Sequence, residues 1–430
     1  MPSEALQNIL YLDALGSNDL QDEALQKILL LEGGGNETLQ EILYLDALAC
    51  GDDDLCNMSS DDSSFVEDDH QDERPTLKLI KTLWGIEEPI SSNLCKSIQQ
   101  EGYHGVEVIR LAYWTNDART TLIQSLNDAS LKCVCQVHTA GGYLSKDGAY
   151  MYCGAYSVEA HKADFRKQLR ECIELIQQVQ QGGLINVHAG VDAWSDDEAC
   201  DFLEFCLSEL AQVAVVMVAP SFTSTLTSTS TSTTSSSIPV TFETHRQRLF
   251  GNPFQTQRLL SLPSLSKIRL NADLSHWYCA CERVFDEKEE RDAHWWPTMV
   301  RSILATKCDY IHARFGWAQG PQMADPSAVE CESERLLQIN VWRVLLQQQI
   351  KVKGSSVSDA GGDGAGGGAG GRHRQCNNDV FVCPEYGPVP YMAVMPHTQK
   401  SVASLPDAVA YTKNIIEELF ESICKSNENS

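Results

Sequence analysis

Short apolar segments with strand-like patterning alternate with longer helix-like segments between residues 76 and 424, and this order limits the fold more than any other feature. Eight segments of each kind follow one another in strict alternation, which is typical of a (β/α)8 TIM barrel of the α/β class. Strands are expected at residues 77–84, 105–111, 131–139, 184–189, 238–243, 268–273, 310–314 and 380–385. Helices are expected near residues 91–101, 117–129, 158–181, 196–212, 254–262, 286–305, 328–350 and 405–424.

Residues 1–75 differ from the rest of the chain in charge, and we predict that they form an extension and linker separate from a barrel of residues 76–430. They hold nineteen acidic and two basic residues, so −17 of the net charge of −26 belongs to the extension and −9 to the remainder. An imperfect repeat at 5–15, 24–31 and 38–48 predicts short amphipathic helices, which are marginal alone. A disordered or loosely attached extension is therefore favoured over the alternative, an acidic repeat that docks on a protein partner.

Two low-complexity stretches interrupt the barrel pattern. Residues 221–237 are almost all Ser and Thr and precede the fifth expected strand, while residues 354–371 are rich in Gly and precede the eighth. Both are interpreted as flexible spacers at the strand-entry end of the barrel. They would then lie away from the loops that follow the strands, where such barrels keep their chemistry.

Composition narrows the setting in which the chain works. No run of eighteen apolar residues is present, which argues against a membrane span. The start, Met1-Pro2-Ser3-Glu4, lacks the basic and apolar layout of a secretory signal, so a cytoplasmic location is expected. The sixteen Cys are then expected to be buried thiols and not a disulfide framework. No basic stripe offsets the acidic net charge, which disfavours nucleic acid as a partner.

Polar residues occupy alternate positions in several expected strands. His138 belongs to such a polar set in the third strand, His188 in the fourth and Glu243 in the fifth. The outer face of a barrel packs on helices and must be apolar, so these side chains are expected to point inward. Two roles stay open for His138 and His188: contact with a substrate or extra metal ligation, or a hydrogen-bonded place in the interior. Arg246, just after the fifth strand, could bind a phosphate or carboxylate, or equally well close the barrel mouth through a salt bridge.

Four expected strands end in side chains that can bind a metal ion, namely Glu243, Asp273, His312 and Glu385. Burying the three carboxylates without a cation or a hydrogen-bond partner would be costly. We therefore predict that the four side chains meet around one divalent cation. A majority of oxygen ligands with one imidazole suits Mn2+, Mg2+ or Co2+, and Zn2+ is also compatible. A lone Glu at a strand end is more often a surface residue, but four metal-capable side chains at the ends of consecutive strands favour a site.

Five segments at or near the expected strand ends share a recognisable pattern, namely Phe242-Glu243-Thr244-His245-Arg246, Asn271-Ala272-Asp273-Leu274-Ser275-His276-Trp277, Ile311-His312-Ala313-Arg314, Pro384-Glu385-Tyr386-Gly387-Pro388 and Gly102-Tyr103-His104-Gly105-Val106-Glu107. Together they resemble the xylose isomerase-like TIM barrels of the sugar phosphate isomerase/epimerase family. The resemblance covers residues 76–420 and leaves the acidic extension unexplained. The Asp-x-x-His element with its flanking Glu and His strands is fairly specific to the superfamily but not to one substrate.

The resemblance implies roles for individual residues and a class of reaction. The metal would be held by Glu243, Asp273, His312 and Glu385. Glu243 and Glu385 would also act as acid and base on opposite faces of a bound ketose, and His276 and Arg314 would contact substrate oxygens. The implied reaction is isomerisation or epimerisation of a sugar, sugar phosphate or small hydroxy-carbonyl compound, by proton transfer through an enediolate.

Two other functions remain open. The first is metal-dependent phosphodiester cleavage of the endonuclease IV type, which shares the barrel and needs ligands for three zinc ions. His138 and His188 are placed where they could serve as the additional zinc ligands. No Asp-x-His pair follows His312, however, and this absence argues against the three-zinc site. The second is a barrel that keeps its metal and serves as a binding or scaffold protein, with the acidic repeats as its docking element. An isomerase or epimerase with a small carbohydrate-like substrate is favoured over both.

Overall fold

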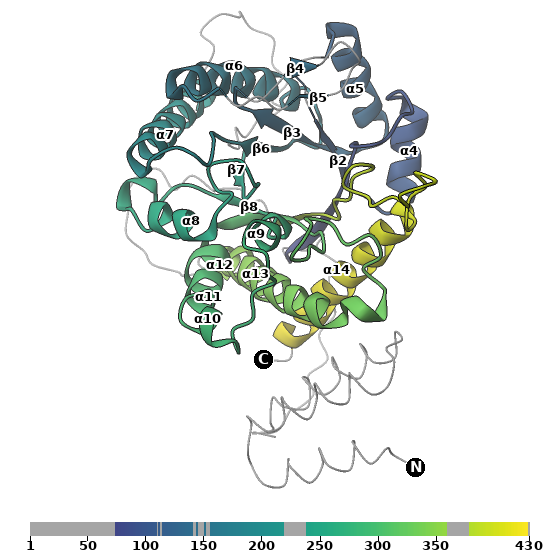
Figure 1. Ribbon diagram of the computed structural model, residues 1–430. Helices are drawn as coiled ribbons and strands as arrows, with labels where there is room; N and C mark the ends of the chain where they lie inside the picture. Colours follow the sequence, from purple (N-terminus) through teal and green to yellow (C-terminus); the bar gives the residue numbers. More distant parts are fainter. Residues whose placement is uncertain are drawn as a thin grey trace, which may run out of the picture.

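Eight parallel strands close into a barrel in the computed structural model (Figure 1). Each barrel strand pairs with the barrel strand before it in the chain, and β10 pairs with β1 to complete the ring. The barrel strands are β1 (Thr76–Thr82), β2 (Gly105–Val108), β3 (Lys132–His138), β6 (Gly183–His188), β7 (Val240–Glu243), β8 (Leu270–Ala272), β9 (Cys308–His312) and β10 (Asp379–Cys383). A small antiparallel pair, β4 (Tyr143–Leu144) and β5 (Tyr150–Met151), follows β3. The predicted α/β class, the barrel and all eight of its strands are confirmed.

The structure describes residues 74–109, 111, 114–140, 143–144, 150–151, 155–218, 238–358 and 378–428. The predicted N-terminal extension, apart from its last two residues, and the Ser/Thr-rich stretch at 221–237 lie outside these ranges. The Gly-rich stretch was expected to begin as a spacer at residue 354, but the helix before it continues to Ser358, and the remainder up to residue 371 lies outside the described residues.

Helices surround the strands and form the outer wall of the barrel (Figure 1). The longer ones are α4 (Ser92–Gln100), α5 (Asn116–Asp128), α6 (Val158–Ile176), α7 (Asp196–Val218), α8 (Pro253–Leu260), α13 (Glu332–Ser358) and α14 (Leu405–Glu428). Side chains cap several of them, as the hydroxyls of Ser91, Thr115 and Ser157 do for α4, α5 and α6. None of the helices in the described part of the chain combines the length and the apolar character that crossing a membrane requires.

The single helix expected at residues 286–305 is wrong in detail. This stretch consists of α10 (Glu290–Ala293), α11 (Trp296–Thr298) and a π-helical turn, η3 (Met299–Leu304), which leads into α12 (Ala305–Lys307). Pro297 lies at the first turn of α11, where its ring fits and its missing N–H is not needed. The same ring cannot sit in the middle of a continuous helix without breaking it, which explains the interruption.

The strands divide their side chains between the helical wall and the barrel interior, as their alternating pattern predicts. Ile185 and Val187 of β6 belong to the large core shared with the helices, whereas Asn186 and His188 are buried inside the barrel. A separate apolar cluster fills the interior. Its six members are Ile80, Val134, Leu184, Tyr310, Phe381 and Cys383. Because strands in a parallel barrel run the same way, the polar residues further along each strand collect above this cluster, near the carboxyl ends.

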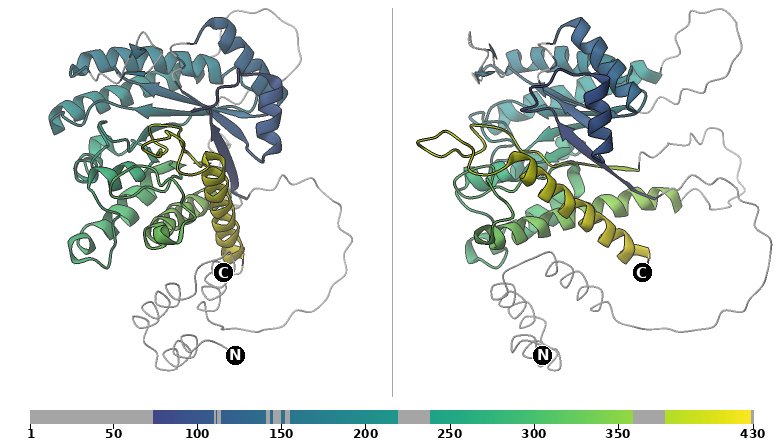
Figure 2. Two further views of the ribbon diagram at one scale, coloured as in Figure 1. Left: turned by 45° about the vertical axis from the view of Figure 1, so that its right-hand side comes forward. Right: turned by 90° about the vertical axis from the view of Figure 1, so that its right-hand side faces the viewer.

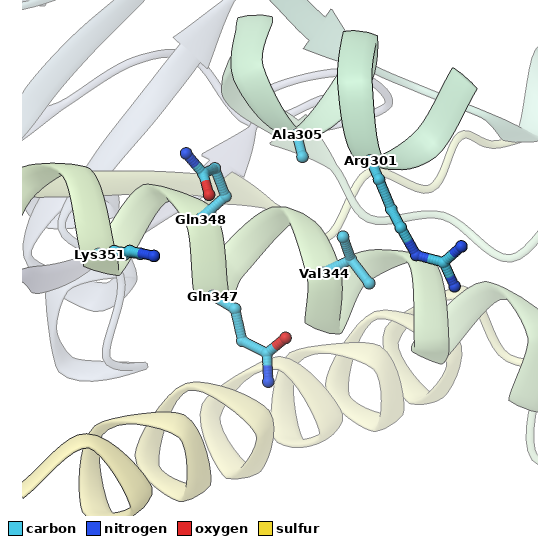
Figure 3. Close-up of a pocket in the computed structure, with 6 residues that line it drawn as sticks. All are labelled: Arg301, Ala305, Val344, Gln347, Gln348 and Lys351. Atoms are coloured by element: carbon cyan, nitrogen blue, oxygen red, sulfur yellow. The ribbon is translucent and has the colours of Figure 1, made fainter. Parts of the chain in front are cut away.

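The loops that follow the strands gather at one end of the barrel, and the long loop between β10 and α14 projects there (Figure 2). A groove of about 230 Å³ lies elsewhere, on the helical wall beside α13 (Figure 3). It is lined by Arg301, Ala305, Val344, Gln347, Gln348 and Lys351. Its lining holds neither carboxylates nor His side chains, so it offers none of the predicted metal-binding groups.

Candidate active site

The carboxyl ends of four neighbouring strands bring four metal-capable side chains together. Glu243 ends β7, His312 ends β9, and Asp273 and Glu385 follow β8 and β10 closely. All four residues are buried, with 0% to 6% of each exposed. Nδ1 of His312 lies 3.6 Å from Oε2 of Glu243, 4.0 Å from Oδ2 of Asp273 and 3.4 Å from Oε2 of Glu385. Ligand atoms of Glu243, Asp273 and His312 therefore lie within 4.8 Å of one another, and the Glu385 carboxylate lies beside the same nitrogen of His312.

The turn after β8 fixes the position of Asp273. Its backbone N–H donates to Oγ1 of Thr244 at 2.8 Å, and the Thr244 hydroxyl donates back to the carbonyl oxygen of Asp273 at 2.8 Å. The Asp273 carboxylate accepts hydrogen bonds from the backbone N–H of Ser275, at 3.2 Å, and from the Ser275 hydroxyl. These contacts join the turn after β8 to the end of β7, so the two carboxylates cannot move independently.

His312 is held from the opposite side of its ring. Nε2 forms a hydrogen bond of 3.2 Å with Oε1 of Glu107, a fully buried residue of β2, while Nδ1 has no hydrogen-bond partner among the described residues. A cation bound at about 2.0–2.2 Å from its ligands would hold neighbouring ligand atoms roughly 3.0–3.5 Å apart. The three distances from Nδ1 to the carboxylates, 3.4 to 4.0 Å, need only small adjustments to meet that range. The donor set therefore fits a divalent cation.

Two buried amides orient Glu243. Oε2 accepts a hydrogen bond of 2.6 Å from Nδ2 of Asn186 and one of 3.3 Å from Nδ2 of Asn271, and it lies 3.0 Å from Nε2 of His188. Oδ1 of each amide has no hydrogen-bond partner among the described residues. Buried polar atoms are nearly always paired, so these oxygens are suited to a bound ligand or water.

The three carboxylates differ in their affinity for protons. Burial alone would raise the pKa of Glu243, but the positive charges of His188 and His312 outweigh it and hold that pKa well below its ordinary value. Burial is likewise overcome at Glu385, where His312 and Arg314 lower the pKa to about 2. At Asp273 burial prevails over Arg314, and with the nearby charges of Glu385 and Glu243 it raises the pKa to about 7. Glu243 and Glu385 are therefore the stronger candidates for ionised groups at neutral pH.

Arg314 binds the metal-capable carboxylates themselves. Its guanidinium forms an ion pair of 3.0 Å with Glu385 through Nη1 and a second ion pair with Asp273 through Nη2. Nη2 also donates to Nε2 of His276 at 2.8 Å, and Nε donates to Oγ of Ser275 at 3.1 Å. The sequence predicts Arg314 as a substrate contact, but the observed bonds point to a group that holds the carboxylates in place.

Four imidazole rings form a row beside the carboxylates. His138 stacks on His188 with ring centroids 4.2 Å apart, His188 lies 5.1 Å from His245, and His245 lies 3.9 Å from His276. Burial, aided by the charge of His188, lowers the pKa of His245 to about 3, and burial also lowers the pKa values of His138 and His276. Apart from His188, the rings are therefore neutral hydrogen-bonding groups, and the three predicted as substrate contacts, His138, His188 and His276, all belong to the row.

Tyr391, in the loop after β10, packs against two arginines of this arrangement. Its ring lies 5.2 Å from the Arg314 guanidinium and 5.4 Å from that of Arg246, and the ring of Trp84 meets it edge-on at 4.7 Å. Arg246, a predicted substrate contact, also bonds Sγ of Cys279 at 3.4 Å. It thus lies at the rim of the site and not beside the carboxylates.

Several residues of the site were not assigned a role from the sequence: Glu107, Asn186, Asn271, Ser275 and Tyr391. Asn186 and Asn271 occupy inward positions of their strands, so the alternation that revealed Glu243 could have found them. Glu107 sits in a strand of four residues that are all buried, which is too short and uniform to show which way it faces. Tyr391 lies in a loop without periodicity.

Three groups of metal-capable side chains occur among the described residues: Glu243, Asp273 and His312; His188, Glu243 and His245; and Glu107, His312 and Cys383. Glu243 belongs to two of them, and so does His312. In the group with Glu243 and Asp273, the nearby nitrogen of His312 is Nδ1, which has no hydrogen-bond partner among the described residues. In the group with Glu107 and Cys383, the nearby nitrogen is Nε2, which is hydrogen-bonded to Glu107.

No protein-family model matches the sequence, and no curated protein matches it. Among solved structures, an IOLI protein with a binding zinc atom is 10% identical, with 82% of this chain and 97% of that chain covered at a TM-score of 0.40. A xylose isomerase domain protein from Alicyclobacillus acidocaldarius subsp. acidocaldarius is 12% identical, with 82% of this chain and 100% of that chain covered at a TM-score of 0.37. An AP endonuclease, family 2, from Brucella melitensis is 11% identical, with 55% of this chain and 78% of that chain covered at a TM-score of 0.36. Likeness at this level says nothing about activity; xylose isomerase-like barrels are among the solved structures that this (β/α)8 barrel resembles.

Proposed function

We propose that the protein is a divalent-metal-dependent isomerase or epimerase of a sugar, a sugar phosphate or a small hydroxy-carbonyl compound. One observation carries the proposal: a buried imidazole nitrogen without a hydrogen-bond partner among the described residues faces three carboxylates from three other strand ends. Carboxylate oxygens together with one imidazole nitrogen form a donor set that suits a divalent cation once His312 gives up its proton. When bound, such a cation would stabilise the negative charge that builds on a carbonyl oxygen when a neighbouring C–H loses its proton.

Glu243 and Glu385 are the groups that we assign to proton transfer. They lie at the ends of β7 and β10, on two sides of His312, and both have pKa values below the ordinary range for the reasons given above. An ionised carboxylate on each side could take a proton from one face of a substrate and return one on the other face, which is the requirement for epimerisation.

His276 is the side chain best placed to bind a substrate oxygen. Because Arg314 donates to Nε2, the proton of the neutral ring lies on Nδ1. That nitrogen is buried and has no hydrogen-bond partner among the described residues. A substrate hydroxyl or carbonyl oxygen would satisfy it, and the row of neutral rings beside it would offer further donors and acceptors to a polyhydroxylated molecule.

Hydrogen exchange with solvent tests the proposed chemistry whatever product the reaction gives. The protein is stripped of metal with a chelator, supplied with Mn2+, Mg2+, Co2+ or Zn2+, and incubated in D2O with a panel of ketoses, aldoses, their phosphates and hydroxy-keto acids. Mass spectrometry should show deuterium at the carbon next to the carbonyl of one class of compound, and only with metal. If no compound in the panel exchanges with any of the four ions, the proposal fails.

Variants of the two acids identify the groups that move the proton. Glu243→Gln and Glu385→Gln are expected to lower the exchange rate by about 10²–10⁴-fold, the contribution of a positioned acid or base. Glu209→Gln is the matched control, because Glu209 is a buried carboxylate paired with Arg166 on the helical wall at 2.9 Å. Circular dichroism checks that each variant folds. Full activity in both site variants would contradict the assignment.

Phosphodiester cleavage of the endonuclease IV type is the second candidate. It is favoured by the position of Glu243, which belongs to two groups of metal-capable side chains. Glu243 forms one metal-capable group with His188 and His245 and another with Asp273 and His312. A carboxylate shared by two cations is typical of hydrolytic sites whose metals lie about 3.5–4 Å apart. The acidic charge of residues 76–430, net −9, weighs against a nucleic-acid substrate.

Metal stoichiometry separates the two candidates. One tightly bound ion per chain supports the isomerase or epimerase, and two or three zinc ions support the hydrolase. Incubation with a DNA duplex that contains one abasic site provides the matching activity test, with metal-free protein as the control.

A further inference from the structure

Glu107 is buried inside the barrel and contacts His312 at Nε2, the ring nitrogen opposite the one that faces the proposed metal site. It belongs to β2, none of its surface is exposed, and both of its carboxylate oxygens lie 3.2 Å from Nε2 of His312. In the ring of strands β1 and β10 separate β2 from β9, so the contact spans part of the interior and does not join adjacent strands. A carboxylate at this depth is costly unless it is bonded, and the imidazole supplies the bond.

We propose that Glu107 is a positioning residue that fixes the tautomer and the orientation of His312, and this rests on the proposed metal-dependent function. A carboxylate has only acceptor atoms, so the hydrogen between it and Nε2 belongs to the imidazole. When the ring is neutral, its lone pair then lies on Nδ1. Nδ1 is the atom that faces Glu243, Asp273 and Glu385 at 3.4 to 4.0 Å. Without Glu107 either nitrogen could carry the hydrogen, and the ring could present an N–H to the cation.

Glu107 is also linked to a second ligand. Nδ2 of Asn186 lies 3.4 Å from Oε1 of Glu107 and 2.6 Å from Oε2 of Glu243. The amide of Asn186 therefore stands between the two carboxylates and spaces them by donating to both. One side chain on β2 thus contacts His312 directly and Glu243 through a single amide, so two of the four proposed ligands depend on it.

Cys383 defines the competing arrangement. Its sulfur, Glu107 and His312 form one of the three metal-capable groups, so a cation could in principle lie behind the imidazole. Such a cation would bind Nε2 and would break the hydrogen bond between His312 and Glu107. The two arrangements therefore assign opposite nitrogens of one ring to the metal, and this difference can be measured.

Metal affinity of the full chain tests the proposed role of Glu107. Isothermal titration with Mn2+ is carried out on the wild type, on Glu107→Gln and on the matched control Glu209→Gln, with thermal unfolding of each metal-free protein as a check on folding. Loss of an outer carboxylate that orients a metal-bound His typically weakens binding by about 10–100-fold. We expect that loss for Glu107→Gln and wild-type affinity for Glu209→Gln.

Nitrogen-15 NMR of the Zn2+-loaded protein provides a second readout that is independent of affinity and activity. With labelled His, and His312 assigned through His312→Gln, the spectrum should show Nδ1 bound to metal and Nε2 carrying hydrogen. The Co2+ spectrum should lack a thiolate charge-transfer band.

The outcomes are distinct for the two proposals. Unchanged affinity in Glu107→Gln, an equal loss in Glu209→Gln, or metal on Nε2 of His312 would each overturn the role of Glu107 while leaving metal binding intact. If the wild type binds none of the tested cations, the proposed function itself fails.

Discussion

Arg314 supplies the positive charge that two of the buried carboxylates share. It pairs with Glu385 at 3.0 Å and with Asp273, and its own residue is only 2% exposed. Lys would not reproduce this geometry, because its ammonium is a compact point charge and lacks the planar fork of a guanidinium. At the scale of single residues, Arg314 therefore pairs with two of the acids that are proposed to bind the cation.

Removing Arg314 should destabilise the metal-free protein and make its stability depend strongly on metal. Arg314→Met leaves two buried carboxylates without their partner, which is expected to cost about 3–5 kcal/mol in the free energy of unfolding. Mn2+ should recover part of that loss, because it neutralises the same oxygens. Urea unfolding with and without Mn2+ measures both effects.

Arg283→Met is the control for the Arg314 prediction, since Arg283 pairs with the buried Asp292 at 2.8 Å on the helical wall. Its loss of stability should be insensitive to Mn2+ beyond the gain seen in the wild type. An equal response of the two variants to Mn2+ would show that Arg314 and the cation do not share ligands.

The sequence predicts the four proposed ligands because each lies at the end of a strand whose polar and apolar residues alternate. Glu107 belongs to one of the segments that carry the resemblance, but the sequence assigns it no role, because it contacts His312 across 205 positions of sequence and that contact exists only once the ring of strands has closed. The sequence identifies Arg314 as a residue of the site, but it does not predict which groups the guanidinium contacts. Those groups, Asp273, Ser275 and His276, are brought to it by the fold and not by any local pattern.

At the scale of elements, the closeness of neighbouring strands limits which residues can occupy the pairing positions. Gly183 begins β6, and a Cβ atom there would lie 1.8 Å from the carbonyl oxygen of Cys133 in β3. The preceding Gly182 has a φ of +67°, but nothing lies within 4 Å of its Cβ position. The two neighbours therefore need glycine for different reasons, one for space and the other for backbone conformation.

Gly183→Ala should destabilise the barrel more than Gly182→Ala does. The methyl group added at position 183 would push β3 and β6 apart, and such overpacking costs about 1–3 kcal/mol or more. Gly182→Ala carries only the strain of the left-handed conformation, about 1–2 kcal/mol. Thermal unfolding of both variants compares them directly. Equal losses, or a larger loss for Gly182→Ala, would mean that β6 can shift away from β3 at little cost.

Strands and helices differed in how well the sequence predicted them. The strands are predicted because each is an apolar segment bounded by turn residues, and seven of the helices are predicted from the longer stretches that lie between the strands. The stretch at 286–305 was misjudged because its hydrophobic spacing continues through Pro297, while the backbone cannot.

At the scale of the whole molecule, every strand of the barrel comes from residues 76–383, so the ring closes without residues 1–73. A chain that begins at residue 74 is therefore expected to fold, to keep an unfolding free energy close to that of the full chain, and to retain metal binding. Differential scanning calorimetry and metal titration check these expectations. Loss of folding would show that the acidic extension is part of the barrel's structure and not a separate docking element.

Titration of the full chain with Mn2+ tests most directly whether the four strand ends form one cation site. We expect one tight site per chain in the wild type, and no tight site in His312→Gln or Asp273→Asn, although both variants remain folded by circular dichroism. Wild-type affinity in both variants, or a wild type without a tight site, would contradict the assignment of Glu243, Asp273, His312 and Glu385 as metal ligands.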